Sequence, residues 1–429
     1  MIGLTLFSMF FGAGNLIFPP FLGAMAGEQT WPAFLGFAVT AVGFPILGIV
    51  AVARTGGLNR LAGRVHPRFA FVFTLITYLF IGPCLAIPRT ASTSYAMAME
   101  PFTDGRLQGW LLLAYSIIFF TVAAVMAWNP EKLSEKLGKV TTPCLLVLVL
   151  VLTAGCMLQM EPQYGKAALQ YQETPFSRGV LDGYQTLDAL AALNFGIILA
   201  LNIRNLGVTE EKAQMRETIL AGLFAGGLLF LIYALLAHAG AVEGSRNASV
   251  SNGAQVLSNL AGSLYGGWGY LVLAVMFVLA CLNTCVGLLS CCSKYFSELF
   301  PAVSYHRWLI GWAAVSMLIS NAGLDAILRI SEPLLNAVYP VALVLILLSF
   351  APARLQAVRA LYPLTVGSTF LFSVIHVIGE QGFLVSAAEA FFEQIPFYKE
   401  GFGWIWPAAL SVLICTGISV GSSAKNVVE

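Results

Sequence analysis

Apolar runs of about 20 residues follow one another along nearly the whole of the 429-residue chain. In a lipid bilayer every unpaired backbone N–H or C=O group is costly, so a run of this length is typical of a membrane-spanning helix. The composition agrees, because 58% of the residues are hydrophobic and 10% are charged, whereas a soluble domain carries roughly 25% charged residues. The sequence therefore predicts an all-α membrane protein.

Twelve spans can be placed, and no stretch between them resembles a soluble domain. We predict the spans at residues 1–26, 31–53, 69–98, 109–128, 139–160, 184–203, 215–239, 264–293, 306–322, 330–350, 361–379 and 402–421. The longest polar connections lie near residues 161–183 and 240–263. We therefore expect a single membrane domain over residues 1–429.

Basic residues gather in the even-numbered connections between these spans. Examples are Arg54, Arg60, Arg64 and Arg68 after the second span, and Arg354 and Arg359 after the tenth. Short connections rich in Lys and Arg stay on the cytoplasmic side during insertion. The asymmetry predicts a multi-pass protein with both termini in the cytoplasm. No positively charged stretch precedes the first apolar run, so we expect a retained helix rather than a cleaved signal peptide.

Several classes of function lack the residues that they need. The formal net charge of +1 provides no basic surface for nucleic acid, and scattered histidines and cysteines without a CxxC pair provide no metal-site spacing. A membrane enzyme would need a nucleophile with a base, or a metal cluster, and no such group is apparent. A passive channel would need a polar lining or a ring of charges. No obligate protein partner is evident. Of the classes of function considered, a coupled carrier is the one that the sequence does not exclude.

The first apolar run contains the sequence FFGAGNLIFPPF at residues 10–21, which interrupts its helical character. Residues 1–11 as a helix would rise about 16 Å, close to half of a hydrocarbon core about 30 Å thick. By themselves, Gly12 and Gly14 indicate only close helix packing, but the adjacent Asn15 and the proline pair favour a break at the bilayer midplane. Such a break frees backbone C=O and N–H groups, which a zwitterion and a cation would satisfy.

A secondary transporter built from an inverted repeat would carry a second break at the corresponding place of its other half. The sixth span, TLDALAALNFGIILALNI, places Asn194 and Gly196 at mid-depth, five spans after the first break. This register predicts a 5+5 inverted repeat, with halves at residues 1–160 and 184–350 and with broken helices 1 and 6. Two additional helices over residues 361–421 complete the chain.

The chain also contains GAGNLIFPP in the first span, GPCLAIPRT at residues 82–90, LDALAALNFG in the sixth span and LACLNTCVGL in the eighth. Together these motifs resemble the bacterial branched-chain amino acid:cation symporter family, and the resemblance covers essentially the whole chain. It implies uptake of leucine, isoleucine and valine across the bacterial inner membrane, coupled to Na⁺ as the co-transported ion. It also implies the inverted-repeat fold of the neurotransmitter:sodium symporters.

On this fold the substrate carboxylate would meet the positive end of the second half-helix at Gly14, Asn15 and Leu16. The ammonium would meet carbonyl groups, and an apolar pocket would hold the side chain, although ordinary packing is the alternative for the residues that line it. The candidate substrate-binding residues are Phe10, Phe11, Gly12, Ala13, Gly14, Asn15, Leu16, Leu190, Ala191, Leu193, Asn194 and Phe195. We expect Gly14→Val to block substrate binding and Gly12→Ala to be milder.

The most widespread sodium site of this fold uses oxygen ligands from the first and eighth spans, as a hard cation requires. The resemblance assigns this site to Ser8, Phe11, Ala280, Asn283 and Thr284. An alternative register uses Cys281, Thr284 and Cys285, in which sulfur would be a poor ligand for sodium. A hydrogen bond from the Thr284 hydroxyl to the carbonyl one turn back is the structural alternative.

Arg89 falls within the third span, about 30 Å along it, so we expect it to reach the outer surface. A gate role opposite Asp188 or Glu332 stays open, although an acidic residue in the first turn of a helix is the more common role for a residue such as Asp188. A proton-coupled transporter of the same fold is the alternative to sodium coupling. It would need an ionisable residue at mid-depth near the cation site, and we expect none there.

Overall fold

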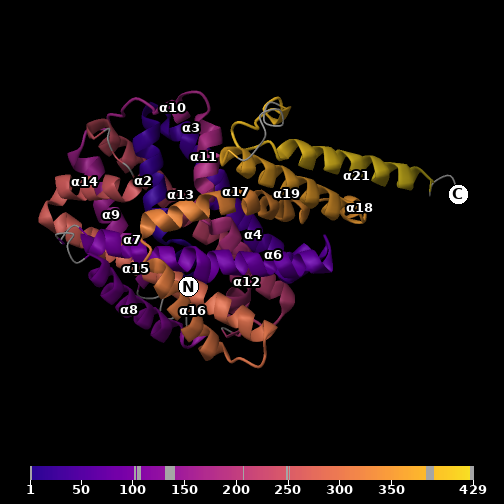
Figure 1. Cartoon of the computed structure of the whole chain (residues 1–429), viewed down its shortest axis with the longest axis horizontal. Coiled ribbons are helices and arrows are strands. Elements are labelled where there is room, and N and C mark those ends of the chain that lie inside the picture. Colours follow the sequence, from indigo (N-terminus) through magenta and orange to yellow (C-terminus); the bar gives the residue numbers. More distant parts are fainter. Residues whose placement is uncertain are drawn as a thin grey trace. The chain divides into compact units, whose positions relative to one another are not determined.

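The computed structural model describes residues 2–100, 103, 108–130, 141–205, 207–247, 250, 252–382 and 391–425. Within these residues the secondary structure is helical and contains no strand, as Figure 1 shows, which confirms the predicted all-α fold. The chain forms two compact units, one of Met1–Val50 with Thr77–Arg329 and the other of Ala51–Ile76 with Ile330–Glu429.

Eight helical stretches among the described residues are long and apolar enough to cross a membrane. They are Ala13–Thr55, Pro67–Ala98, Gln108–Ala127, Thr142–Gln159, Glu211–Arg246, Gly267–Leu299, Leu324–Leu348 and Leu361–Glu380. The first of these joins part of the first predicted span to the second, and residue 139, the predicted start of the fifth span, lies outside the described residues. The membrane character is confirmed, and the count of twelve spans stays a prediction.

The first predicted span is broken, as its sequence indicated. Helix α1 covers Ile2–Phe10 and α2 covers Ala13–Ala26, so the break consists of Phe11 and Gly12. Gly12 is extended, with φ −122° and ψ −153°, and its N–H donates to the Asn15 side-chain oxygen at 3.0 Å. Asn15 therefore closes the first turn of α2 by bonding back to the residue that precedes the helix.

Helix α2 packs against α13, which covers Glu211–Arg246. A Cβ atom placed on Gly23 would lie 1.9 Å from the Ala237 carbonyl oxygen, and one placed on Gly240 would lie 2.0 Å from the Pro20 carbonyl oxygen. The two backbones therefore touch, which small residues allow in membrane helices. This contact fixes the half-helix that begins at the break.

The second break is real, but its predicted position at Asn194 and Gly196 was wrong. Helix α12 runs without interruption over Asp188–Asn205, and α11 precedes it over Pro175–Tyr184. The interruption lies at residues 185–187, where Leu187 has a φ of 68°. A branched side chain at positive φ is strained, and such strain is typical of functional sites.

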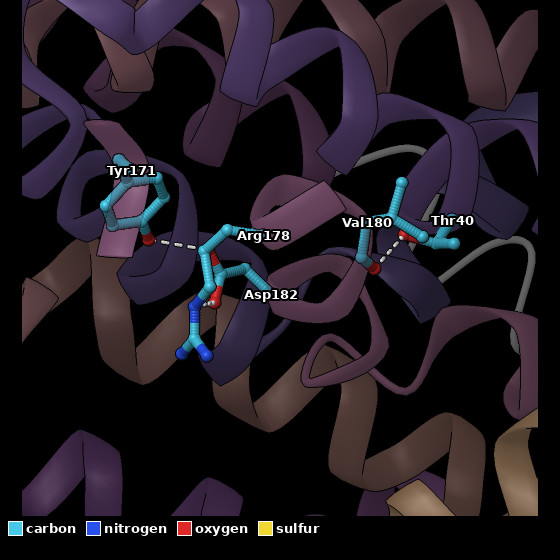
Figure 2. A network of polar contacts seen from close by, with 5 residues as sticks. All are labelled: Thr40, Tyr171, Arg178, Val180 and Asp182. Carbon is cyan, nitrogen blue, oxygen red and sulfur yellow. Dashed lines mark hydrogen bonds and ion pairs between the residues drawn. The ribbon is translucent and has the colours of Figure 1, made fainter. Parts of the chain in front are cut away.

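Polar contacts fix α11 just before this break (Figure 2). The Tyr171 hydroxyl, on α10 (Leu169–Gln172), donates to Asp182 at 2.6 Å, and Arg178 forms an ion pair with Asp182 at 3.2 Å. The Thr40 hydroxyl donates to the Val180 carbonyl at 2.8 Å. Thr40 lies in the π-helix η2 (Val39–Gly43), which follows α3 (Thr30–Ala38) and precedes α4 (Phe44–Thr55).

A third break divides the third predicted span, residues 69–98. Helix α6 (Pro67–Leu79) passes into the π-helix η3 (Phe80–Cys84), where Gly82 has non-helical backbone angles, and α7 then covers Ala86–Ala98. Helix α15 (Gly267–Leu299) packs beside this break, because the Cys292 thiol donates to the Tyr78 carbonyl at 3.4 Å. The other helices of the first unit are η1 (Gly27–Gln29), α8 (Gln108–Ala127), α9 (Thr142–Gln159), α14 (Gly253–Tyr265) and α16 (Tyr305–Ser320).

The second unit contains short helices between long ones. Its described elements include α5 (Leu58–Gly63), most of α17 (Leu324–Leu348), α18 (Ala353–Gln356), α19 (Leu361–Glu380) and α21 (Ile405–Lys425). Helices α19 and α21 pack together, and the Ser368 and Ser411 hydroxyls form a hydrogen bond of 3.2 Å between them.

Candidate functional site

The three breaks of the first unit surround one small cavity of about 20 Å³. Residues of α1, α2, η3, α7, α12 and α15 contribute to its walls, together with the 185–187 interruption. The lining residues are Met9, Phe10, Gly12, Ala13, Gly14, Asn15, Ile81, Ala86, Arg89, Thr90, Thr186, Leu187, Asp188, Ala191, Phe195, Thr284 and Leu288. Broken helices place unpaired backbone groups and irregular segments at a cavity, which is where such segments are tolerated in a membrane protein.

Several residues predicted from the sequence line this cavity, and others do not. Those at the wall are Phe10, Gly12, Ala13, Gly14, Asn15, Ala191, Phe195 and Thr284. Those outside it are Ser8, Phe11, Leu16, Leu190, Leu193, Asn194, Ala280 and Asn283. The Asn194 amide donates to the Leu190 carbonyl at 2.8 Å within α12, so this carbonyl is already engaged.

Asp188 is the central polar residue of the site, for which the sequence offered either a gate role opposite Arg89 or the role of an acidic residue in the first turn of a helix. It is 2% exposed and accepts hydrogen bonds from the Asn15 amide at 2.6 Å and from the Tyr233 hydroxyl at 3.1 Å. The Asn15 amide also donates to the Tyr233 hydroxyl. Asp188 and Thr284 line the same cavity, so an ionisable residue shares a wall with a residue that we expect to bind the cation.

Arg89 also lies in the site, and its expected position near the outer surface was wrong. It is 4% exposed and donates from Nη1 to the Gln185 carbonyl at 3.0 Å. Its guanidinium lies 5.8 Å from the centre of the Phe18 ring, at a distance typical of a cation–π contact. The predicted position assumed an unbroken helix, whereas the span breaks at Gly82, and the adjacent glycine and proline of the GPC sequence indicate this break.

The first break and α15 meet at Gly12 and Thr284. A Cβ atom on Gly12 would lie 2.5 Å from the Thr284 hydroxyl oxygen, so only glycine fits against this threonine. The Ser8 and Thr284 hydroxyls and the Asn283 amide are buried and have no hydrogen-bond partner among the described residues. Buried oxygens without a partner fit a site for a hard cation. Cys285, from the alternative register, instead contacts Thr90 of α7.

The cavity is too small for an amino acid in the arrangement described. A volume of about 20 Å³ holds about one water molecule, whereas small-molecule pockets typically measure about 300 to 1,000 Å³. The rings of Phe10 and Phe195 lie 5.2 Å apart, centre to centre, at the wall. Binding of a larger molecule therefore requires side chains or half-helices to move.

A family model described as "Branched-chain amino acid transport protein" matches residues 1–421. The chain is 38% identical over 416 residues to the branched-chain amino acid permease BraB of Bacillus subtilis. This alignment covers 96% of this chain and 94% of that protein. It is also 38% identical over 416 residues to the branched-chain amino acid transport system 2 carrier protein of Pseudomonas aeruginosa, with the same coverage. Among solved structures, MhsT in complex with L-phenylalanine matches over 98% of both chains with a TM-score of 0.58 and 16% identity, which shows a shared fold.

These matches bear directly on the sequence-based predictions. The relatives are named as a permease and a carrier, which confirms the prediction of a transport protein rather than an enzyme. The family model covers nearly the entire chain, as the resemblance of the four motifs did. The chain belongs to the branched-chain amino acid transport protein family.

Proposed function

We propose that this protein imports leucine, isoleucine and valine together with sodium, across the bacterial inner membrane, by alternating access. The observation that carries the proposal is a buried cavity where three broken helices meet and whose wall contains one basic residue, Arg89, and one acidic residue, Asp188. A zwitterion is the small molecule whose charges complement such a pair. The names of the relatives, which specify branched-chain amino acids, supply the substrate class.

The substrate's carboxylate would bind at the start of α2. The helix dipole is positive there, and the Arg89 guanidinium lies beside it, since a Cβ atom on Gly14 would be 2.9 Å from Nη2 of Arg89. The ammonium would bind Asp188, whose carboxylate already accepts two hydrogen bonds from neutral donors. The branched side chain would lie against Phe10, Phe195 and their apolar neighbours.

Sodium would bind where the first break meets α15. Thr284 and Ser8 offer hydroxyl oxygens, and backbone carbonyls of the interrupted helix, at Phe11 among others, offer the rest of an oxygen shell. The unpartnered state of these buried hydroxyls supports this assignment. The inverted repeat of five and five helices, with two further helices, would place the cation and the amino acid near the bilayer midplane.

Proton coupling is a second candidate, and one observation favours it. Asp188 is a buried carboxylate that lines the substrate cavity, and intramembrane carboxylates frequently form proton relays. In this alternative a proton on Asp188 would take the place of sodium. The two candidates differ in which ion gradient drives uptake.

The deciding experiment is uptake of radiolabelled leucine into proteoliposomes containing the purified protein. Sodium and proton gradients are imposed separately, at equal membrane potential. We expect accumulation with the sodium gradient and only facilitated equilibration with the proton gradient. Accumulation driven equally well by protons in the absence of sodium would establish the second candidate. Strong inhibition by glutamine or serine would contradict the apolar pocket, because burying a polar group without a partner costs about 1 to 3 kcal/mol.

A further inference from the structure

The second unit carries a concentration of positive charge that the proposed transport function does not use. Residues 51–76 and 349–361 contain six arginines and no aspartate or glutamate. All six are exposed, namely Arg54, Arg60, Arg64, Arg68, Arg354 and Arg359. In the described part of the chain none of them forms an ion pair with a carboxylate. The carboxylates of the described residues therefore leave this charge uncompensated.

Two of these arginines line an open cavity of about 460 Å³. Arg64 follows α5, and Arg359 lies between α18 and α19. Gln356 and Tyr362 contribute polar groups to the wall, and small or aliphatic residues complete it. The volume lies within the range of about 300 to 1,000 Å³ that is typical of ligand pockets.

Arg64 is held in place by neutral partners. Its Nη1 atom donates to the Gln356 side-chain oxygen at 2.7 Å and to the Tyr362 hydroxyl at 2.8 Å. Those partners are fixed in turn, because Gln356 donates to the Ala351 carbonyl at 2.7 Å and Tyr362 donates to the Leu348 carbonyl at 3.0 Å. The Arg64 guanidinium is therefore oriented by neutral groups and keeps its positive charge. The N–H groups of Nε and Nη2 can donate to a further acceptor.

The cavity lies where membrane helices end. Helix α17 ends at Leu348 and α19 begins at Leu361, while α4 ends at Thr55 and α6 begins at Pro67. Both α17 and α19 are apolar enough to cross a membrane, and each carries an exposed leucine near the end that adjoins the 349–361 connection, Leu347 at 48% and Leu364 at 42% exposure. An amphiphile would find cationic donors at the level of the lipid headgroups and an aliphatic surface next to them.

We propose that this cavity binds the phosphodiester headgroup of an anionic phospholipid. Guanidinium groups pair with phosphate oxygens through two parallel hydrogen bonds, and arginines at a membrane surface attract anionic lipids. Inorganic phosphate shares this headgroup chemistry, but the cavity lies between the ends of two apolar helices, α17 and α19, which favours a lipid as the source of the phosphodiester. The bound lipid would bridge the 56–66 connection and the 349–361 connection.

The test is a titration of the detergent-solubilised full-length protein with phosphatidylglycerol, monitored by native mass spectrometry. Arg359→Gln is the main variant, because Arg359 makes no hydrogen bond or ion pair within the described residues. Arg68→Gln is the matched control, since it removes the same charge from an exposed position outside the cavity. We expect phosphatidylglycerol affinity to fall at least about fivefold in Arg359→Gln and less than about twofold in Arg68→Gln.

Three further arms can overturn the proposal. Equal losses in Arg359→Gln and Arg68→Gln would show diffuse surface attraction instead of a site. Equal affinity for zwitterionic phosphatidylcholine would show that the site does not recognise the net negative charge of the headgroup. Displacement of phosphatidylglycerol by inorganic phosphate at equal concentration would identify a free-phosphate site. Unchanged leucine binding in both variants confirms that they are folded.

Discussion

Gly12 lies in the first break and Gly14 in the first turn of α2, but a methyl group would meet different neighbours at each. At Gly12 it would lie 2.8 Å from Cβ of Thr284, a short side chain that cannot turn away. At Gly14 it would lie 2.9 Å from Nη2 of Arg89, the far end of a flexible side chain. The structure therefore favours Gly12 as the more sensitive position, although the sequence suggested a milder effect of Gly12→Ala.

We predict that Gly12→Ala destabilises the protein by about 1 to 3 kcal/mol, the usual cost of overpacking, and that Gly14→Ala has a smaller effect. The measurement is the thermal-unfolding midpoint of each purified variant in the same detergent. The companion measurement is leucine binding, which Gly14→Ala should still weaken by displacing Arg89. A midpoint for Gly14→Ala as low as that for Gly12→Ala would show that Arg89 cannot move aside.

Asp188→Asn tests the proposed ammonium site with a change of charge at nearly constant shape. An amide oxygen can still accept from Tyr233, but the charge-assisted bond to the ammonium is lost, so leucine affinity should fall about 10- to 100-fold. Equilibrium binding of labelled leucine measures the effect. Asp182→Asn is the control, because that carboxylate pairs with Tyr171 and Arg178 and does not line the cavity. Equal losses of affinity in the two variants would place Asp188 in the structural framework instead.

At the scale of the elements, sequence patterns located breaks only where glycine and proline marked them. The first break was predictable because Gly12, Gly14 and the following prolines stand together in an apolar run. The second break consists of Gln185, Thr186 and Leu187, none of which signals a break, and Leu187 is held at positive φ by its surroundings. Sequence reasoning chose Asn194 and Gly196 instead, and both fit inside a continuous helix.

The missed third break had a larger consequence than the misplaced second one. Treating residues 69–98 as one straight helix put Arg89 at the outer surface, whereas the π-helix at residues 80–84 ends near the cavity and α7 starts there. The sequence therefore offered Arg89 and Asp188 only as a possible pair at an outer gate and not as residues of the substrate cavity. A distance measured along a span is valid only if the span is unbroken.

The anchoring of α11 can be tested through the Tyr171 hydroxyl. Tyr171→Phe removes a hydrogen bond to the carboxylate of Asp182 and should lower stability by roughly 1.5 to 3 kcal/mol, while leaving the cavity residues in place. The thermal-unfolding midpoint should therefore fall, and leucine affinity at low temperature should stay close to that of the wild type. In an Asp182→Asn background the same substitution should have a smaller effect, as expected for residues that interact directly. Additive effects of the two substitutions would contradict the contact in Figure 2.

At the scale of the whole molecule, charge asymmetry predicted which connections share a side of the membrane. Within the second unit, the hydrogen bonds from Arg64 to Gln356 and Tyr362 bring the connection after the second predicted span next to the one after the tenth. This proximity agrees with the prediction that the even-numbered connections lie on the same side of the membrane. The sequence could not specify how three breaks converge, because that depends on tertiary packing such as the backbone contact between α2 and α13.

Coupling between the amino acid and sodium is a property of the whole transporter, and Thr284→Ala tests it. Thr284 contacts Gly12 at the break that would bind the substrate, and its hydroxyl has no partner among the described residues. Removing this hydroxyl takes one oxygen from the shell of a small cation, so sodium affinity should fall while direct contacts with leucine remain. If both ligands favour the same conformation, their coupling is a free energy shared by the two sites.

Leucine affinity of Thr284→Ala should therefore be reduced at low sodium and should recover as sodium approaches saturation. The measurement is equilibrium leucine binding across a sodium titration, with the wild type and Thr284→Ala in parallel and with Ser290→Ala as a control from the same helix. The Ser290 hydroxyl donates to the Val286 carbonyl at 2.7 Å and lies outside the cavity, so its removal should leave the sodium dependence unchanged. A loss in Thr284→Ala that is equal at every sodium concentration would assign Thr284 to the substrate pocket or to packing. An unchanged sodium dependence would show that the cation binds elsewhere.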